Sequence, residues 1–318
     1  MSATALARGT EWARRRFTEP ERPLVAIEVR ASAVGVLRVR RDHGRLAVAA
    51  AASMELPAGT LALSLTQPNV VDAARFRQAL HGALERAGVL GGARVAVVLP
   101  DTAARVALVP AVEVPAKKPA EIDEVLRFRL RKAMPFEIRD ARVAHAAPGS
   151  RPNDALVVAA AAGTVVGGYE EVCRSLGLAP GLVEVAGMAL ARAAFAGGAP
   201  GDGLLVNWDE GYLTLVLARD GWPILVRTLS GAAVASTADV LREVSSTLIY
   251  YHERLGGQGL ARALVRSTLH TSEAATAALA PVLKFDPEPM DAWAALGGAP
   301  PEAAQSLAGA AAALGAAD

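Results

Sequence analysis

The chain has 318 residues, of which 52% are hydrophobic, and its 33 Lys and Arg residues nearly balance its 32 Asp and Glu residues. Single hydrophobic cores stop growing near about 250 to 300 residues, so we expect two lobes. A formal net charge of +1 provides no broad basic surface for nucleic acid. The one cysteine, Cys173, has no second thiol for a disulfide or a CxxC pair, which indicates a reducing compartment.

Residues 1–23 are expected to form a basic tail, because the arginines at 14–16 are followed by polar residues and not by the apolar segment of a signal peptide. A weak contact of this cluster with anionic lipid is the alternative. The longest uncharged run, 155–169, contains three glycines and is shorter than the roughly 20 residues that span a bilayer. The sequence therefore predicts a cytoplasmic protein.

Two parts of the sequence, 24–52 and 204–229, repeat one plan of three short strands. In each copy an apolar strand ends in a polar residue, an alternating strand follows, and a turn containing Asp and Gly, at 41–44 or 220–221, leads to the third strand. Asp and Gly between alternating segments favour a hairpin, because Gly accepts the positive φ of primed turns. The repeat predicts that each lobe begins with a three-stranded meander.

Helical patterns follow both meanders. Phe76, Leu80 and Leu84 recur at four-residue steps before Gly88, and a similar apolar stripe runs through 241–255. Segment 103–177 differs, since prolines bound its loops and strands alternate with helices. Its expected elements are strand 105–109, helix 121–134 stopping at Pro135, strands 141–147 and 155–161, and a closing helix that contains Tyr169 and Cys173. The apolar side of helix 121–134 is expected to consist of Ile122, Val125, Leu126, Phe128 and Leu130.

These patterns divide the chain into a first lobe, an inserted subdomain and a second lobe. The expected bounds are 24–102 and 178–200 for the first lobe, 103–177 for the insert, 201–290 for the second lobe, and 291–318 as a segment that completes the first lobe. The tail after Pro287 is rich in Ala and Gly and could be disordered. Trp293, Leu296, Leu307 and Leu314 favour a returning helix instead.

The order of these elements resembles the actin and sugar-kinase superfamily, and more closely the FtsA-related type IV pilus assembly protein PilM family. The opening strand 24–34, the helix that runs into Met134-Pro135-Phe136, and segment 246–257 with its Gly256-Gly257 pair carry the likeness. The resemblance implies an α/β, actin-like, two-lobed fold with a β-α-β-β-α subdomain inserted in the first lobe.

In that superfamily ATP lies between the lobes, two hairpin turns hold its phosphates, and acidic strand ends hold magnesium through water. The resemblance makes eight residues nucleotide-binding candidates: Glu28, Arg30, Ser32, Asn207, Asp209, Glu210, Gly211 and Thr214. Several positions depart from the family pattern. Arg30 and Asp209 stand in place of glycines, Asn207 in place of an aspartate, and 266–268 in place of a glycine pair.

These departures predict a degenerate site that binds ATP and Mg weakly or not at all. One alternative is that Arg30 pairs with a phosphate and binding survives through different contacts. Another is that Glu28, Asn207 and Thr214 are ordinary polar residues of hairpins with no ligand.

The resemblance also implies a partner, namely a PilN-like inner-membrane protein whose N-terminal cytoplasmic peptide docks beside the insert, together with other pilus platform proteins. The candidate peptide contacts are Arg127, Arg131, Met134 and Phe136. The competing interpretation places the apolar members in the core and the arginines on a solvated face. The implied function is a cytoplasmic scaffold, peripheral to the inner membrane, that acts by binding.

Three other functions are compatible with these sequence patterns. A type II secretion platform component shares the fold, an ATPase or small-molecule kinase would belong to the same superfamily, and an FtsA-like filament scaffold also has an early insert. The five histidines have no metal-binding spacing, and no Walker A, GxSxG or serine-lysine motif is visible. The sequence therefore offers no catalytic residue and no metal ligand.

Overall fold

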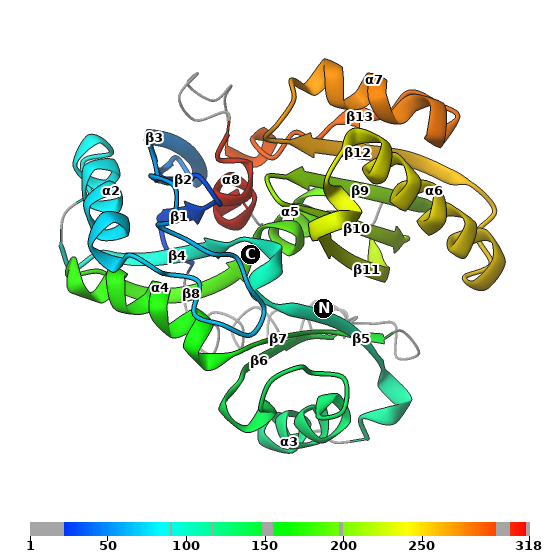
Figure 1. The fold of residues 1–318 in the computed structure, drawn as a ribbon, viewed down its shortest axis with the longest axis horizontal. Helices are drawn as coiled ribbons and strands as arrows, with labels where there is room; N and C mark the ends of the chain where they lie inside the picture. Colours follow the sequence, from blue (N-terminus) through cyan, green and yellow to red (C-terminus); the bar gives the residue numbers. More distant parts are fainter. Residues whose placement is uncertain are drawn as a thin grey trace, which may run out of the picture.

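The computed structural model describes residues 22–89, 91–115, 118–147, 155–196, 200–296 and 306–315. These residues form two lobes, each built on a five-stranded sheet, and a smaller unit with a three-stranded sheet (Figure 1). Most of the basic tail expected at 1–23 lies outside the described residues.

The first sheet has the strand order β3-β2-β1-β4-β8. Its strands are β1 (Val25–Val29), β2 (Ala33–Asp42), β3 (Arg45–Glu55), β4 (Arg94–Leu99) and β8 (Ala179–Val185). Strands β1 to β3 pair antiparallel, whereas β4 pairs parallel with both β1 and β8. Both faces of a parallel sheet are covered in such folds, and β1 and β4 accordingly read as nearly continuous apolar runs.

The second sheet repeats this plan in the order β11-β10-β9-β12-β13. Its strands are β9 (Asp202–Asp209), β10 (Tyr212–Arg219), β11 (Trp222–Ser230), β12 (Leu260–Ser267) and β13 (Glu288–Pro289). The meander turns have positive φ at both central residues, 47° and 81° at His43 and Gly44, and 47° and 85° at Asp220 and Gly221. These values fit primed turns, so the predicted duplication of meanders is confirmed.

Among the described residues, six α-helices complete the two lobes in layers. They are α2 (Ala73–Arg86), α4 (Gly163–Ser175), α5 (Ala186–Ala194), α6 (Thr237–Arg254), α7 (Ser272–Leu283) and α8 (Ala308–Gly315), with short 3-10 helices η4 (Gly231–Val234) and η5 (Ala294–Leu296). Figure 1 shows α2 and α4 outside the first sheet, α5 and α8 between the sheets, and α6 and α7 outside the second. Among the described residues, none of the helices is both long and apolar enough to serve as a bilayer-crossing segment.

Alternating strand residues supply these layers. Ile27 of β1 packs into the core shared with α2 and α4, whereas its neighbour Ala26 joins the core that contains α5 and α8. That middle core also includes Leu205 and Leu264 of the second sheet, so α5 and α8 pack between both lobes. Small residues permit this close packing. A Cβ at Gly35, for example, would lie 2.2 Å from Leu307 Cδ2.

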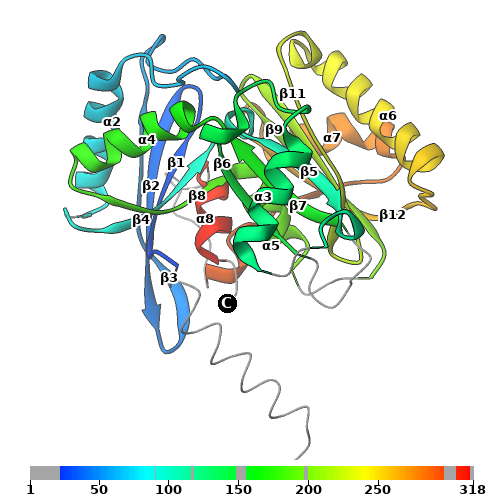
Figure 2. The same ribbon diagram turned by 90° about the horizontal axis from the view of Figure 1, so that it is seen from below.

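The inserted unit consists of η1 (Asp101–Ala103), β5 (Arg105–Pro110), η2 (Ala111–Glu113), α3 (Pro119–Leu130), η3 (Ile138–Asp140), β6 (Arg142–Ala146) and β7 (Ala155–Ala161). Its sheet has the order β5-β7-β6, and Figure 2 shows α3 across it. Helix α3 ends at Leu130, four residues before the predicted Met134, and turns at 131–133 lead to Pro135. Pro135 disfavours helical geometry at Met134, so the chain cannot continue as a helix through this point.

Helix α4 lies within 103–177, the segment that was predicted from the sequence to form the insert. Its buried side chains Val165, Tyr169 and Cys173 pack with Phe76 of α2 in the first-lobe core. Phe76 and Tyr169 meet edge to face, with ring centroids 5.9 Å apart. The separate core of the insert comes from β5, β7, α3 and η3.

Candidate functional site

A buried polar cluster lies between the two sheets, where the first meander strand of each lobe carries its polar residue. Glu28 lies in β1, and Asn207 and Asp209 lie at the end of β9. These three residues are 0%, 0% and 2% exposed. The two strands occupy equivalent positions in their sheets, which is why the repeat brings their polar residues to one place.

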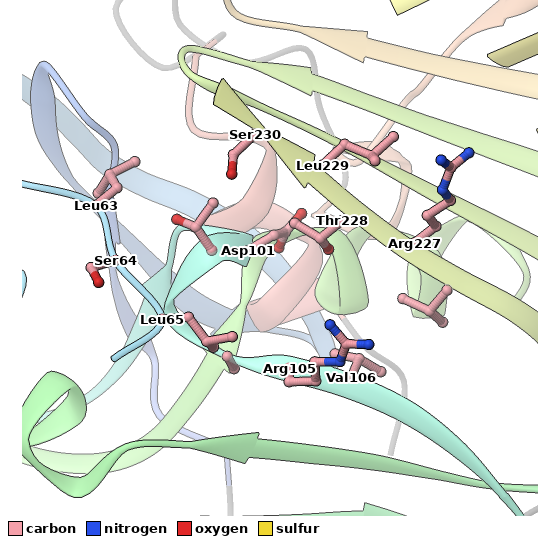
Figure 3. A pocket seen from close by; sticks show the side chains of 13 residues that line it. Leu63, Ser64, Leu65, Asp101, Arg105, Val106, Arg227, Thr228, Leu229 and Ser230 are labelled. Carbon is pink, nitrogen blue, oxygen red and sulfur yellow. The ribbon is translucent and has the colours of Figure 1, made fainter. Parts of the chain in front are cut away.

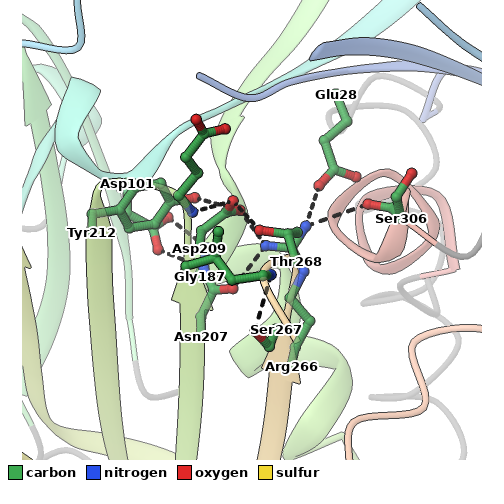
Figure 4. Close-up of polar contacts among 12 residues, drawn as sticks. Glu28, Asp101, Gly187, Asn207, Asp209, Tyr212, Arg266, Ser267, Thr268 and Ser306 are labelled. Carbon is green, nitrogen blue, oxygen red and sulfur yellow. Dashed lines mark hydrogen bonds and ion pairs between the residues drawn. The ribbon is translucent and has the colours of Figure 1, made fainter. Parts of the chain in front are cut away.

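The side chain of Arg266, at the end of β12, fills the centre of this cluster (Figure 4). Its Nη2 donates to Glu28 Oε1 at 2.8 Å, and its Nη1 donates to Asn207 Oδ1 at 2.9 Å and to Asp209 Oδ2. Nη2 also lies 3.4 Å from the carbonyl oxygen of Ser306. Burial acts against the charged form, but the two carboxylates outweigh it and raise the pKa of Arg266 above its ordinary value.

Asp209 accepts hydrogen bonds from four donors. Besides Arg266, they are Thr268 Oγ1 at 2.5 Å, the Glu210 amide at 2.8 Å and the Tyr212 hydroxyl at 3.1 Å. Burial by itself would raise the pKa of Asp209, but Arg266 and the donors outweigh burial and hold that pKa below its ordinary value. Asp209 is therefore held as a carboxylate.

Glu28 has fewer compensating contacts than Asp209. Its Oε2 accepts the backbone amide of Ala310 in α8 at 2.8 Å, and its Oε1 accepts Arg266. Burial raises the pKa of Glu28, and the charge of Arg266 and the Ala310 amide offset this only in part. The single positive charge of Arg266, with the neighbouring donors, therefore stabilises the ionised form of Asp209 more than that of Glu28.

Asp101, directly after β4, extends the network toward the insert. Its Oδ1 accepts the amide of Gly187 in α5 at 2.6 Å, and its Oδ2 accepts Asn207 Nδ2 at 2.9 Å. Burial raises the pKa of Asp101, with hydrogen bonds from Thr214, Gly187 and Asn207 acting in the opposite direction. A chain of polar contacts therefore runs from Asp101 through Asn207 and Arg266 to Glu28.

The two hairpin turns expected to hold phosphates contact one another directly. Ser32, in the turn between β1 and β2, donates its hydroxyl to a carboxylate oxygen of Glu210, in the turn between β9 and β10. Gly211 follows with φ of 81°. Arg30 is half-buried, and among the described residues its Nε has no hydrogen-bond partner.

The structure brings most of the nucleotide-site candidates to this interface but gives them protein partners. Glu28, Asn207 and Asp209 contact Arg266, and Thr214 contacts Thr228, with 3.0 Å between the hydroxyls. Sequence reasoning identified Arg266 as a departure from the family pattern but not as the centre of the cluster. The sequence feature that could have indicated this cluster is a basic residue, Arg266, at one strand end together with the acidic residues Glu28 and Asp209 at two others.

Three of the four peptide-contact candidates have structural contacts inside the insert. Arg127 binds Asp123 at 2.7 Å and the carbonyl oxygens of Ile138 and Ala141 at 2.7 and 3.0 Å. Met134 is buried in the insert core. Phe136 is half-buried and packs against both the insert core and the first-lobe core.

Arg131, the fourth candidate, directly follows α3 and is exposed. Phe128, expected on the apolar side of the helix, is 76% exposed. The prediction was wrong because Phe128 lies two residues from the buried Leu126, which places it on the opposite face of α3. Across the described residues, no three His, Cys, Asp or Glu side chains are arranged to bind a metal.

A cleft of about 380 Å³ opens beside the buried cluster, within the range of about 300 to 1,000 Å³ typical of ligand pockets (Figure 3). Loop 63–65 of the first lobe, Asp101 and Thr102 of η1, β5 of the insert and β11 of the second lobe line it. Figure 3 shows Arg105 on the β5 side and Thr228 on the β11 side. All three parts of the molecule thus meet at one cleft.

Neither a protein-family model nor a curated protein matches this sequence. Among solved structures, the chain is similar to a Bacteroides thetaiotaomicron protein described as having an actin-like ATPase fold and unknown function. The TM-score is 0.52 at 11% identity, over 92% of this chain and 97% of that chain. Together with the duplicated lobes and the polar strand ends between them, this likeness defines the actin-like two-lobed α/β fold predicted from the sequence.

A more specific likeness is to a chain of the PilM-PilN type IV pilus biogenesis complex. The TM-score is 0.75 at 22% identity, and the match covers 93% of this chain and 98% of that chain. The fold of that chain therefore extends over nearly the whole of this one, as the resemblance implied.

Proposed function

We propose that this protein is an actin-like scaffold of a type IV pilus assembly platform and binds the N-terminal cytoplasmic peptide of a PilN-like inner-membrane protein. The observation that carries the proposal is the fold match, over nearly the full length of both chains, to a chain of the PilM-PilN complex. The protein acts in the cytoplasm, beside the inner membrane, through its partners.

The cleft between β5 and β11 is the proposed docking place. Strand β5 is the edge of the insert sheet and β11 is the edge of the second-lobe sheet. Extended peptides bind at sheet edges through main-chain hydrogen bonds, and adjacent pockets receive their side chains. The cleft is therefore suited to an extended segment.

The charges in the cleft favour a peptide that carries a carboxylate. Arg227 is already engaged, since it donates to Glu243 at 2.7 Å and to Thr247 at 2.9 Å. Arg105 is exposed, and among the described residues no Asp or Glu lies within ion-pair distance of it. We expect Arg105 to pair with an acidic group of the partner.

The test is fluorescence anisotropy with a labelled N-terminal peptide of a PilN-like protein from the same organism. The wild-type protein and Arg105→Glu are compared, and Arg131→Glu serves as the matched control because Arg131 is an exposed arginine at the end of α3 that does not line the cleft. We expect wild type and Arg131→Glu to bind alike and Arg105→Glu to bind at least about tenfold more weakly, which corresponds to the 1.4 kcal/mol of one charge-assisted contact.

Two outcomes would contradict the proposal that the partner peptide docks in the cleft at Arg105. If only Arg131→Glu loses binding, the peptide docks at the end of α3 as the sequence suggested, and not in the cleft. If the wild-type protein does not bind the peptide, the proposed partner is wrong.

A further inference from the structure

Arg266 joins the two lobes. Its side chain is 5% exposed and contacts Glu28 of the first sheet and Asp209 of the second, while its backbone belongs to β12. Glu28 in turn holds the start of α8, the helix packed between the sheets, through the Ala310 amide. The guanidinium of Arg266 therefore links β1 and β9 directly, and α8 through Glu28.

A magnesium-bound nucleotide does not fit this cluster as it is built. The carboxylates of Glu28 and Asp209, which would have to face a hydrated cation, already accept hydrogen bonds from Arg266. The hairpin turns are linked by Ser32 and Glu210, where separated turns would be needed to admit phosphates. Packing around Glu28 is also tight, since a Cβ at Gly309 would lie 3.0 Å from its carboxyl carbon.

The buried carboxylates of this cluster are compensated by a cation of the protein itself. A buried carboxylate is stable as an ion only when an opposite charge or several donors compensate it. In this cluster a covalently attached cation, the Arg266 guanidinium, supplies that opposite charge, and its planar fork reaches acceptors in both lobes.

We propose that Arg266 is a built-in counter-cation that replaces metal and nucleotide at the lobe interface, so that the arrangement of the lobes is set by this side chain and does not respond to nucleotide. This inference goes beyond the proposed function and does not depend on the identity of the partner. It makes the protein a constitutively assembled scaffold and not a nucleotide-driven switch.

The first test uses the full-length wild-type protein with MgATP, MgADP or MgCl₂. A ligand that binds the folded state raises the melting temperature in proportion to the logarithm of its concentration. We expect no shift in melting temperature and no change in the radius of gyration from small-angle X-ray scattering. A saturable rise in melting temperature with MgATP overturns the proposal.

The second test replaces the cation. Arg266→Ala should lower the melting temperature and increase the radius of gyration, because two buried carboxylates lose their counter-charge and the lobes lose their link. Low millimolar guanidinium chloride should restore both quantities, whereas the same concentration of NaCl should not. The matched control is Arg219→Ala, which removes an arginine paired with Asp202 inside the second lobe.

Arg219→Ala should lower the melting temperature without a change in the radius of gyration and without guanidinium rescue. If Arg266→Ala behaves in the same way, Arg266 only stabilises its own lobe and the proposal fails. If Arg266→Ala does not fold, Glu28→Ala gives the decision, since it removes both the charge and the acceptor by which Arg266 holds the first lobe and leaves the Asp209 pair intact. A wild-type radius of gyration in Glu28→Ala overturns the proposal, and an increase supports it.

Discussion

Asp209→Asn is the substitution for which the structure gives the clearest expectation. Asp209 is 2% exposed and accepts hydrogen bonds from Arg266, Thr268, Tyr212 and the Glu210 amide. Asparagine has nearly the same shape but removes the charge and turns one acceptor into a donor. That donor would face at least one of the groups that now donate to the carboxylate.

The expected loss in free energy of unfolding follows from the burial of the Asp209–Arg266 ion pair. Removing one partner of a buried ion pair costs about 3 to 5 kcal/mol, because the other charge is left without compensation. Arg266 keeps Glu28 as a partner, so we expect the lower part of this range, about 3 kcal/mol. This is a large part of the roughly 5 to 15 kcal/mol by which domains are stable. Urea unfolding monitored by circular dichroism measures it directly.

The pH dependence gives an independent check. The folded-state pKa of Asp209 is lowered, so its contribution to the free energy of unfolding is present above the unfolded pKa of about 4 and is lost as the pH falls through the folded pKa. The difference between wild type and Asp209→Asn should therefore be full at pH 7 and should shrink below pH of about 4. Glu28 and Asp101, whose pKa values are raised, titrate in both proteins.

The control is Asp239→Asn, which removes a carboxylate with a lowered pKa from the exposed start of α6. It should change the free energy of unfolding far less than Asp209→Asn does. Equal stability of wild type and Asp209→Asn at pH 7 would refute the reasoning, because it would mean that the buried carboxylate is not paired as described.

Two further predictions concern the cores of the lobes. Gly257→Ala should lower the free energy of unfolding by about 2 kcal/mol through overpacking, because the new Cβ would lie 2.1 Å from Tyr251 Cζ. Gly167→Ala should be neutral or stabilising in urea unfolding, because among the described residues its Cβ would meet no atom within 4 Å beyond the neighbouring backbone of its own helix. Burial raises the pKa of the Cys173 thiol from 9.0 to about 12, so its thiolate fraction at pH 8 falls about a thousandfold and labelling by a disulfide reagent should be slow until urea is added. Labelling of the native protein at the rate of a free thiol would contradict the second prediction.

The Gly256-Gly257 pair shows how a sequence pattern acquires a physical reason from the structure. The pair is one of the features that suggest the PilM resemblance, but no reason for it is apparent from the sequence alone. In the structure Gly257 leaves room for the ring of Tyr251, whose hydroxyl oxygen lies 2.7 Å from Asp202 Oδ2 and 2.9 Å from the carbonyl oxygen of Gly259. The glycine therefore permits the end of α6 to close on the start of the second sheet.

Errors at the insert arose where local pattern and packing disagree. Helix periodicity places Leu126 and Leu130 on one face of α3 and Phe128 on the opposite face. Phe128 was nevertheless predicted to lie on the buried side, because its side chain is apolar. Arg127 looked like a surface residue of a basic helix end, yet its guanidinium ties α3 to η3 through backbone carbonyls. Both assignments depend on which elements pack against the helix, and that is a tertiary property.

The sequence by itself determined the duplicated meanders, their turns and the order of helices and strands, because alternation, helical periodicity and positive φ at Gly are local properties of a few adjacent residues. Only the tertiary structure decided what the polar strand ends contact. Glu28 and Arg266 are 238 residues apart, and the charge of each is compensated only after both sheets and α8 have packed together. No local propensity encodes such a pairing, since it stabilises the chain only when the two lobes meet.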